Sequence, residues 1–135
     1  MDSRYVKRYK DLDLNFIPHP RTGDVSTKED LDALKQSIKT LVLTQLYERP
    51  FRHKMGSRVY GMLFENFNFL TKSVIETEIR NVINNYEPRA NVMNVLVSST
   101  TDNNDEDYTL NVEITFRMKN SENPVKIDFI LERTR

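Results

Sequence analysis

Two short segments of this chain place an acid, a base and a proline side by side: Glu48-Arg49-Pro50 and Glu87-Pro88-Arg89. Proline has no amide hydrogen, holds its own φ at about −65°, and disfavours helical backbone in the residue before it. We therefore expect Glu87 and Arg89 to project rigidly from a fixed corner. An arginine in that position can pair with a carboxylate of a partner protein, or it can brace its own chain. The residues alone leave both interpretations open.

Paired carboxylates could instead hydrolyse a glycosidic bond, which requires two acids across a sugar-sized cleft and an apolar setting for one of them. Glu48, Glu65 and Glu87 are candidates, but a chain with 20 Asp and Glu residues supplies such candidates without any catalytic role. No nucleophile motif or dinucleotide fingerprint is present, and three glycines could hardly build a phosphate-binding loop. We therefore expect no catalytic residue and no cofactor.

The sequence contains no complete metal-binding motif. The acidic run at 102–107 (DNNDED) has Asp107 at the sixth position, where an EF-hand loop has its glycine, which favours a solvated turn. His19 and His53 have no histidine or carboxylate three or four positions further on, which argues against zinc. We expect no bound metal.

The composition is that of a domain with a polar surface and no excess of charge. Of the 135 residues 38% are hydrophobic, and 20 Lys and Arg balance 20 Asp and Glu. This balance argues against nucleic acid as a partner. The chain has no cysteine, no signal peptide and no apolar run long enough to span a membrane. We expect a protein made in the cytoplasm, without disulfides and without a membrane partner.

The N-terminal part predicts an arm followed by a helix. Residues 1–25 show no sustained period, apart from a brief alternation from Asp11 that suits one short strand. Ser26 and Glu29 form a capping-box pair, which predicts that a helix begins there and runs to about Leu43. We expect residues 1–25 to be an N-terminal arm and residues 26–135 to form a single domain.

A structured loop over 44–57 should separate this helix from two more helical segments. Residues 59–64 suit a short helix with Leu63 and Phe64 in the core. Thr71 is the expected cap of the next helix, with Leu70 and Ile75 as a hydrophobic staple. The expected apolar face of that helix, which ends before Pro88, comprises Val74, Ile75, Ile79, Val82, Ile83 and Tyr86.

After Pro88 the hydrophobic period changes from 3.6 to 2, which is typical of strands. Met93, Val95 and Val97 should share one face of the first strand. Strong alternation over 108–118 and again over 125–131 predicts an antiparallel hairpin. We expect an α+β fold, with two to three helices packed on a small, mainly antiparallel sheet formed by the C-terminal half. The hairpin must present a sheet edge, which could pair with another chain.

The chain resembles the family of lysozyme-like baseplate wedge proteins of contractile-tailed bacteriophages, which has relatives in type VI secretion and contractile injection systems. The segments that carry the resemblance are Lys35-Gln36-Ser37-Ile38, Glu48-Arg49-Pro50-Phe51 with Gly56-Ser57, Leu63-Phe64-Glu65, Tyr86-Glu87-Pro88-Arg89 and the meander from Tyr108 to Leu131. A Glu-Pro-Arg triplet between such a helix and such strands is the family's signature. Residues 1–25 carry little of the likeness.

The resemblance implies a structural subunit of a viral tail baseplate. It implies that Glu87, Pro88 and Arg89 dock wedge subunits around the central hub, with Glu48 and Arg49 buttressing them. The strand with Lys126, Ile127, Asp128, Phe129 and Ile130 would face the tail sheath protein and help to initiate the sheath. Implied partners are wedge subunits, the sheath protein and hub or tube proteins, in several copies within the virion, assembled in the host cytoplasm.

The word lysozyme in the family's name raises a rival function. The chain could be a peptidoglycan hydrolase (a muramidase) of the baseplate, or the equivalent baseplate subunit of a type VI secretion system. The residues themselves define no acid and nucleophile pair, so we expect an assembly protein and not an enzyme.

Overall fold

The computed structural model describes residues 10–12, 18, 21, 27–101, 108–119 and 121–132. It divides into two compact units, residues 1–37 and residues 38–135. His19, Ser26 and the acidic run at 102–107 lie outside the described residues, so the predictions made for His19 and for the acidic run remain predictions. In the described part of the chain no helix has the length and apolar character needed to cross a membrane.

The first unit contains a two-stranded antiparallel sheet and the start of a helix. β1 (Lys10–Leu12) pairs with β2 (Thr27–Glu29), with Lys10 opposite Glu29. The short strand expected near Asp11 is therefore present. The expected capping box is wrong, because Glu29 belongs to a strand and α1 (Asp30–Leu43) begins after it. The end of this helix at Leu43 agrees with the prediction.

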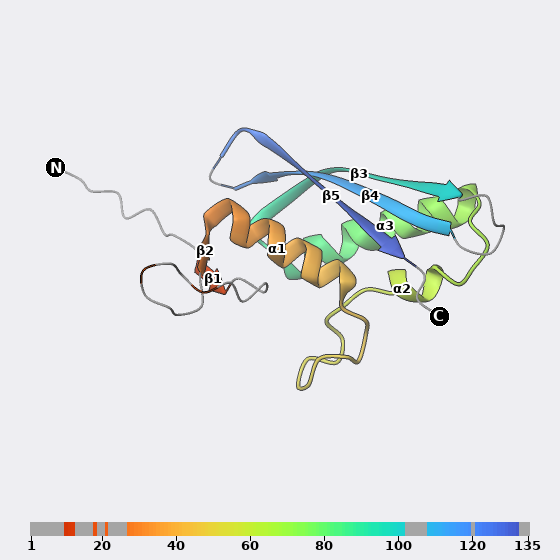
Figure 1. The fold of residues 1–135 in the computed structure, drawn as a ribbon, viewed down its shortest axis with the longest axis horizontal. Helices are drawn as coiled ribbons and strands as arrows, with labels where there is room; N and C mark the ends of the chain where they lie inside the picture. Colours follow the sequence, from red (N-terminus) through yellow and green to blue (C-terminus); the bar gives the residue numbers. More distant parts are fainter. Residues whose placement is uncertain are drawn as a thin grey trace. The chain divides into compact units, whose positions relative to one another are not determined.

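The second unit combines helices with a three-stranded antiparallel sheet (Figure 1). After the last residues of α1 come α2 (Val59–Met62) and α3 (Phe69–Tyr86). The strands are β3 (Ala90–Thr101), β4 (Tyr108–Met118) and β5 (Pro124–Glu132), in the order β3-β4-β5. The expected α+β fold, with the sheet formed by the C-terminal half, is confirmed.

The core of this unit forms where α3 packs against the sheet, next to β3. Four apolar residues of α3 are buried, namely Ile75, Ile79, Val82 and Ile83. They are spaced like one face of a helix, and the alternate residues Val95 and Val97 of β3 and Ile114 and Phe116 of β4 are buried as well. Val74 and Tyr86, which were expected on this apolar face, are exposed.

A β-bulge in β3 changes which side chains share a face. Val92 lies opposite Phe116 and Asn94 opposite Thr115, so Met93 is the extra residue of β3. The prediction that Met93 shares a face with Val95 and Val97 is therefore wrong. Val92 takes that position, and Met93 is exposed.

Two local predictions around α2 and α3 also fail. Asn68 is the N-cap of α3, because its side-chain oxygen accepts a hydrogen bond of 2.9 Å from the amide of Thr71. The helix thus starts before Thr71, and Leu70 is exposed and does not form a staple. In the segment after α2, Leu63 is buried as expected, whereas Phe64 is exposed.

Candidate functional site

The corner between α3 and β3 is held by a bidentate ion pair. The amide of Glu87 donates to the carbonyl of Ile83 at 2.8 Å, which closes α3. Pro88 then turns the chain, and Arg89 folds back onto the carboxylate. Its Nε donates to Oε1 of Glu87 at 2.7 Å, and its Nη2 donates to Oε2 at 2.8 Å. Both carboxylate oxygens and two nitrogens of the guanidinium fork are thereby engaged, which is the strongest geometry available to such a pair.

Burial within this corner is asymmetric. The Glu87 side chain is 5% exposed and the Arg89 side chain 21% exposed, while Pro88 is exposed. The expectation that Glu87 projects outward is therefore wrong. A buried carboxylate is costly unless a cation and hydrogen bonds satisfy it, and Arg89 lies only two residues away to do so. The backbone carbonyl of Arg89 also accepts a 3.1 Å hydrogen bond from the amide of Lys119, just beyond β4.

The loop at residues 44–57 contains the second predicted corner. Oε2 of Glu48 accepts a hydrogen bond of 2.8 Å from the amide of Gln45. Nη1 of Arg49 lies 3.6 Å from the sulfur of Met55. These contacts keep Glu48 and Arg49 within their own loop, and a buttressing role toward Glu87 stays a prediction.

Tyr86 joins this loop to the end of α3. Its phenol donates a hydrogen bond of 2.8 Å to the carbonyl of Lys54, across 32 positions of sequence. Because Tyr86 directly precedes Glu87, this bond fixes the loop against the residue at which the corner begins. Hydrophobic periodicity predicts Tyr86 on the apolar face of the helix and gives no indication of this contact. A tyrosine at a helix end, with a polar group that needs a partner, was the available signal.

The predicted sheath-facing residues lie on an edge strand of the sheet. In β5, Phe129 is buried and Ile127 half-buried, whereas Lys126, Asp128 and Ile130 point to the opposite face and are exposed. β5 pairs with β4 on one side. Ile130 is 60% exposed although it is strongly apolar. The predicted antiparallel hairpin is confirmed, and β5 is one of the two edges of its sheet.

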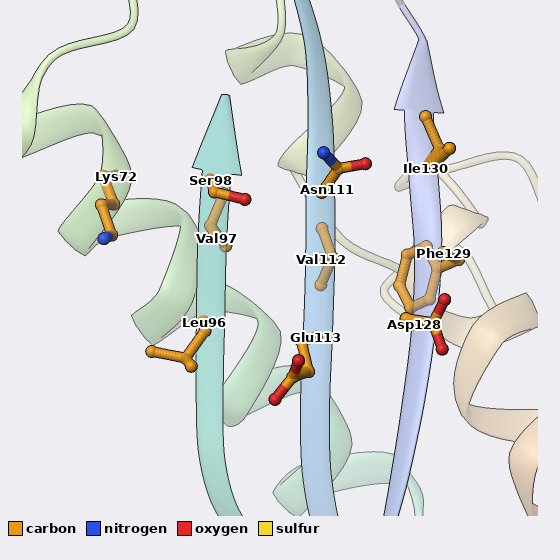
Figure 2. A pocket seen from close by; sticks show the side chains of 10 residues that line it. All are labelled: Lys72, Leu96, Val97, Ser98, Asn111, Val112, Glu113, Asp128, Phe129 and Ile130. Carbon is orange, nitrogen blue, oxygen red and sulfur yellow. The ribbon is translucent and has the colours of Figure 1, made fainter. Parts of the chain in front are cut away.

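The outer face of the sheet has a shallow hollow of about 420 Å³, shown in Figure 2. On this face it is lined by Leu96, Ser98, Asn111, Glu113, Asp128 and Ile130. Glu113 and Asp128 are opposite each other in the register, and Nζ of Lys126 pairs with Oε1 of Glu113 at 2.9 Å. These carboxylates lie on an open face of the sheet and Glu113 is paired with Lys126, which is not the enclosed, water-excluding setting that a glycosidase acid requires.

The opposite edge of the sheet, at β3, is partly covered by α3. The amide of Val97 donates a hydrogen bond of 3.0 Å to Oε1 of Glu76. Lys72, one turn earlier, lies 3.9 Å from the same oxygen. The Glu76 side chain thus accepts the hydrogen bond that the Val97 amide could otherwise donate to another strand. Sequence periodicity did not indicate this role for Glu76.

Comparison with known proteins places this architecture in a family. Residues 28–123 match the family described as baseplate wedge protein gp25. Baseplate wedge protein gp25 of Enterobacteria phage T4 is 35% identical over 124 residues, which cover 92% of this chain and 89% of that protein. The chain belongs to the gp25 family. The resemblance noted in the sequence is thereby confirmed.

Solved structures share the fold of this gp25 family member at low sequence identity. A Geobacter sulfurreducens protein provisionally named a tail lysozyme aligns with a TM-score of 0.65 at 20% identity, over 77% of this chain and 91% of that one. A chain of the anti-feeding prophage baseplate gives 0.63 at 20% identity, over 95% and 88%. A chain of the postcontracted pyocin R2 baseplate gives 0.61 at 22% identity, over 82% and 99%.

The gp25 family match covers some of the predicted site residues and not others. Both the corner at residues 87–89 and the loop at residues 44–57 lie within the matched range, whereas β5 follows it. The structure brings Glu87 and Arg89 into contact and places Lys126 to Ile130 on a different element, the edge strand. The candidate site therefore consists of two separate surfaces, the corner and the β5 edge.

Proposed function

We propose that this protein is a structural subunit of a contractile tail baseplate, which docks neighbouring wedge subunits through Glu87, Pro88 and Arg89. Membership of the gp25 family supports the baseplate setting. The observation that carries the docking role is the bidentate Glu87–Arg89 pair beside an exposed proline. Its proposed partners are other wedge subunits around the hub, the tail sheath protein, and hub or tube proteins. Several copies of the protein would be present in each virion tail.

The corner is suited to docking because its arginine is already oriented. Glu87 holds the guanidinium in one position, so a partner does not have to restrict a mobile side chain. The remaining exposed part of Arg89 and the rigid Pro88 can then meet a carboxylate or carbonyl group of a neighbour. Removing one member of a desolvated charge pair in an interface costs about 2–5 kcal/mol.

The β5 edge supports a second contact, the addition of a strand from the sheath protein. The alternation of hydrogen bonds shows which backbone groups point to that edge. The amide of Val97 points to Glu76 and away from β4, so Val97 and Val112 form a non-hydrogen-bonded pair. Val112 then directs its backbone groups toward Phe129. It follows that the amides of Asp128 and Ile130 point to the outer edge of β5.

The two edges of the sheet differ, and this difference favours β5 as the docking edge. Glu76 occupies the amide of Val97 at the β3 edge, which opposes pairing there. A strand added to β5 would find the amides of Asp128 and Ile130 as donors and the exposed Ile130 side chain as an apolar contact.

We further propose that the protein acts without enzymatic activity and assembles in the host cytoplasm. The rival function is a muramidase, and the open setting of Glu113 and Asp128 counts against it. A zymogram on the purified chain separates the two functions. A clearing zone that disappears in Glu113→Gln or Asp128→Asn variants would establish the rival.

The docking role is tested by co-expression with the wedge subunits of the same tail. Arg89→Lys keeps the charge beside Glu87 but loses the bidentate fork, so the monomer should fold while co-purification of wedge subunits falls. Arg117→Lys is the matched control, because Arg117 is an exposed arginine on β4. Equal co-purification of the wild type and Arg89→Lys would remove the docking role from Arg89.

A further inference from the structure

The loop at residues 44–57 displays two aromatic side chains in an unusual backbone conformation. Phe51 has a φ of 67° and is 98% exposed, and Tyr47 has a φ of 68° and is 77% exposed. A bulky residue in the left-handed region is a genuine outlier, because its Cβ crowds the following carbonyl. Neither the burial of apolar surface nor a preferred backbone geometry explains a phenylalanine at position 51.

Hydrogen bonds join the two ends of the loop to each other and also connect residues inside it. The amide and hydroxyl of Ser57 donate to the carbonyls of Thr44 and Val42, at 2.8 and 2.5 Å. The amide of Tyr47 donates to the carbonyl of His53 at 2.8 Å. Gly56 is required at its position, because its φ is 150° and a Cβ there would lie 2.8 Å from backbone atoms of residues 44 and 45. These bonds restrain the backbone of the loop, which keeps Phe51 exposed at the surface.

An exposed aromatic side chain on a backbone held by hydrogen bonds is well suited to insertion into a partner. Aromatic residues dominate the energetics of interfaces, and a backbone that is already positioned loses little freedom on binding. We propose that Phe51 is an anchor residue, which inserts into an apolar pocket with an acidic rim on a neighbouring baseplate subunit. This inference rests on the proposed function, since the neighbour is a subunit of the same assembly.

The charges around Phe51 define the chemistry of that rim. Residues 47–54 (YERPFRHK) hold three Lys or Arg residues and a single Glu, although the chain as a whole has no net charge. Arg52 and Lys54 follow Phe51 in the loop and are exposed. Carboxylates around the partner's pocket would complement them. A phosphate polymer or a lipid surface would need a broader cationic face than one loop of a neutral chain provides.

The loop surface is distinct from the corner, although the Tyr86 hydrogen bond to Lys54 links the two. Neither Phe51 nor Arg52 belongs to the Glu87–Arg89 pair. A variant at position 51 can therefore test the loop while it leaves the corner intact.

The test uses the full chain co-expressed with the wedge subunits of its own tail. Phe51→Asn suits the backbone, because asparagine tolerates a positive φ better than other residues do. Phe69→Asn is the matched control, since Phe69 is 83% exposed at the start of α3. We expect Phe51→Asn to reduce co-purification of wedge subunits at least about tenfold, and Phe69→Asn to leave it unchanged. Neither variant should melt at a lower temperature than the wild type.

A charge-reversal variant tests whether the rim of the partner's pocket is acidic. Arg52→Glu combined with Lys54→Glu should weaken co-purification, and the remaining binding should lose its dependence on salt concentration. A photoreactive benzoyl-phenylalanine placed at position 51 should cross-link to a wedge subunit, at a peptide that contains apolar residues beside Asp or Glu.

The outcomes separate this inference from the proposed function. If the wild type does not bind wedge subunits, the proposed function fails and the anchor fails with it. If the wild type binds and Phe51→Asn binds equally well, the anchor alone is refuted. An equal loss in Phe69→Asn would also refute it, because any exposed ring would then matter. Binding of the wild type to phosphatidylglycerol vesicles that Phe51→Asn abolishes would assign the loop to a membrane instead.

Discussion

The phenol of Tyr86 and the carbonyl of Lys54 are joined by a hydrogen bond of 2.8 Å, which ties the loop at residues 44–57 to the last turn of α3. Tyr86 is followed directly by Glu87, so one helix end positions both the loop and the corner. The two charged corners identified in the sequence are thus linked through Tyr86, which belongs to neither of them.

Tyr86→Phe removes this connection and keeps the ring. We expect a loss of about 1 kcal/mol or less in the free energy of unfolding, because the bond lies at the surface. The larger effect should be local, with faster hydrogen exchange at the amides of Tyr47 and Met55, which are bonded within the loop. Unchanged exchange at these two amides would mean that the loop is held without Tyr86.

Phe51→Asn should leave the monomer as stable as the wild type, or stabilise it by up to about 1 kcal/mol, because it relieves a left-handed phenylalanine. Urea unfolding followed by circular dichroism measures this. A variant destabilised by more than about 1 kcal/mol would show that the ring supports the fold. Stability retained together with lost assembly is the combination expected of a binding residue.

Proline substitutions in β5 should have opposite effects at neighbouring positions. Asp128→Pro removes an amide that points to the outer edge, so the β4–β5 hairpin should persist while attachment of the sheath protein is blocked. Phe129→Pro removes an amide that pairs with Val112 and replaces a buried ring, so it should unfold the hairpin. Circular dichroism and sheath sedimentation assays distinguish the two. Normal sheath attachment by a folded Asp128→Pro variant would exclude this edge.

Glu76→Ala should expose the amide of Val97 at the β3 edge. We expect a loss of about 1 kcal/mol in stability and a greater tendency of the purified chain to self-associate, measured by light scattering. Glu122→Ala, in the exposed turn before β5, is a suitable control. If the two variants remain equally monomeric, Glu76 does not protect the edge.

Hydrophobic periodicity was enough to predict the helices, the hairpin and the α+β class, because burial of one face of each element determines that pattern. It failed where tertiary hydrogen bonds decided the outcome. Glu29 belongs to a strand that pairs with β1, and Asn68 caps α3 in place of Thr71. The bulge at Met93 reversed the expected alternation, because an inserted residue leaves no mark in a period of two.

In the candidate site, too, local sequence predicts some features, and tertiary contacts determine the others. The rigid turn at Pro88 follows from the chemistry of proline, but the direction of the Glu87 side chain does not. Burial of that carboxylate depends on Arg89 lying within reach and on Lys119 holding the backbone of Arg89. The exposed Phe51 was invisible for a related reason, since a phenylalanine in a sequence is expected in the core.

The corner's role in docking is tested most directly by comparing Arg89→Ala with the double variant Glu87→Gln/Arg89→Ala. The single variant leaves a buried carboxylate without its arginine, so it should lose stability, by up to about 3–5 kcal/mol. The double variant removes that carboxylate and should recover much of the loss. We expect the double variant to fold and still to fail to co-purify with wedge subunits. Wild-type co-purification by the folded double variant would contradict it and leave the corner as an internal brace.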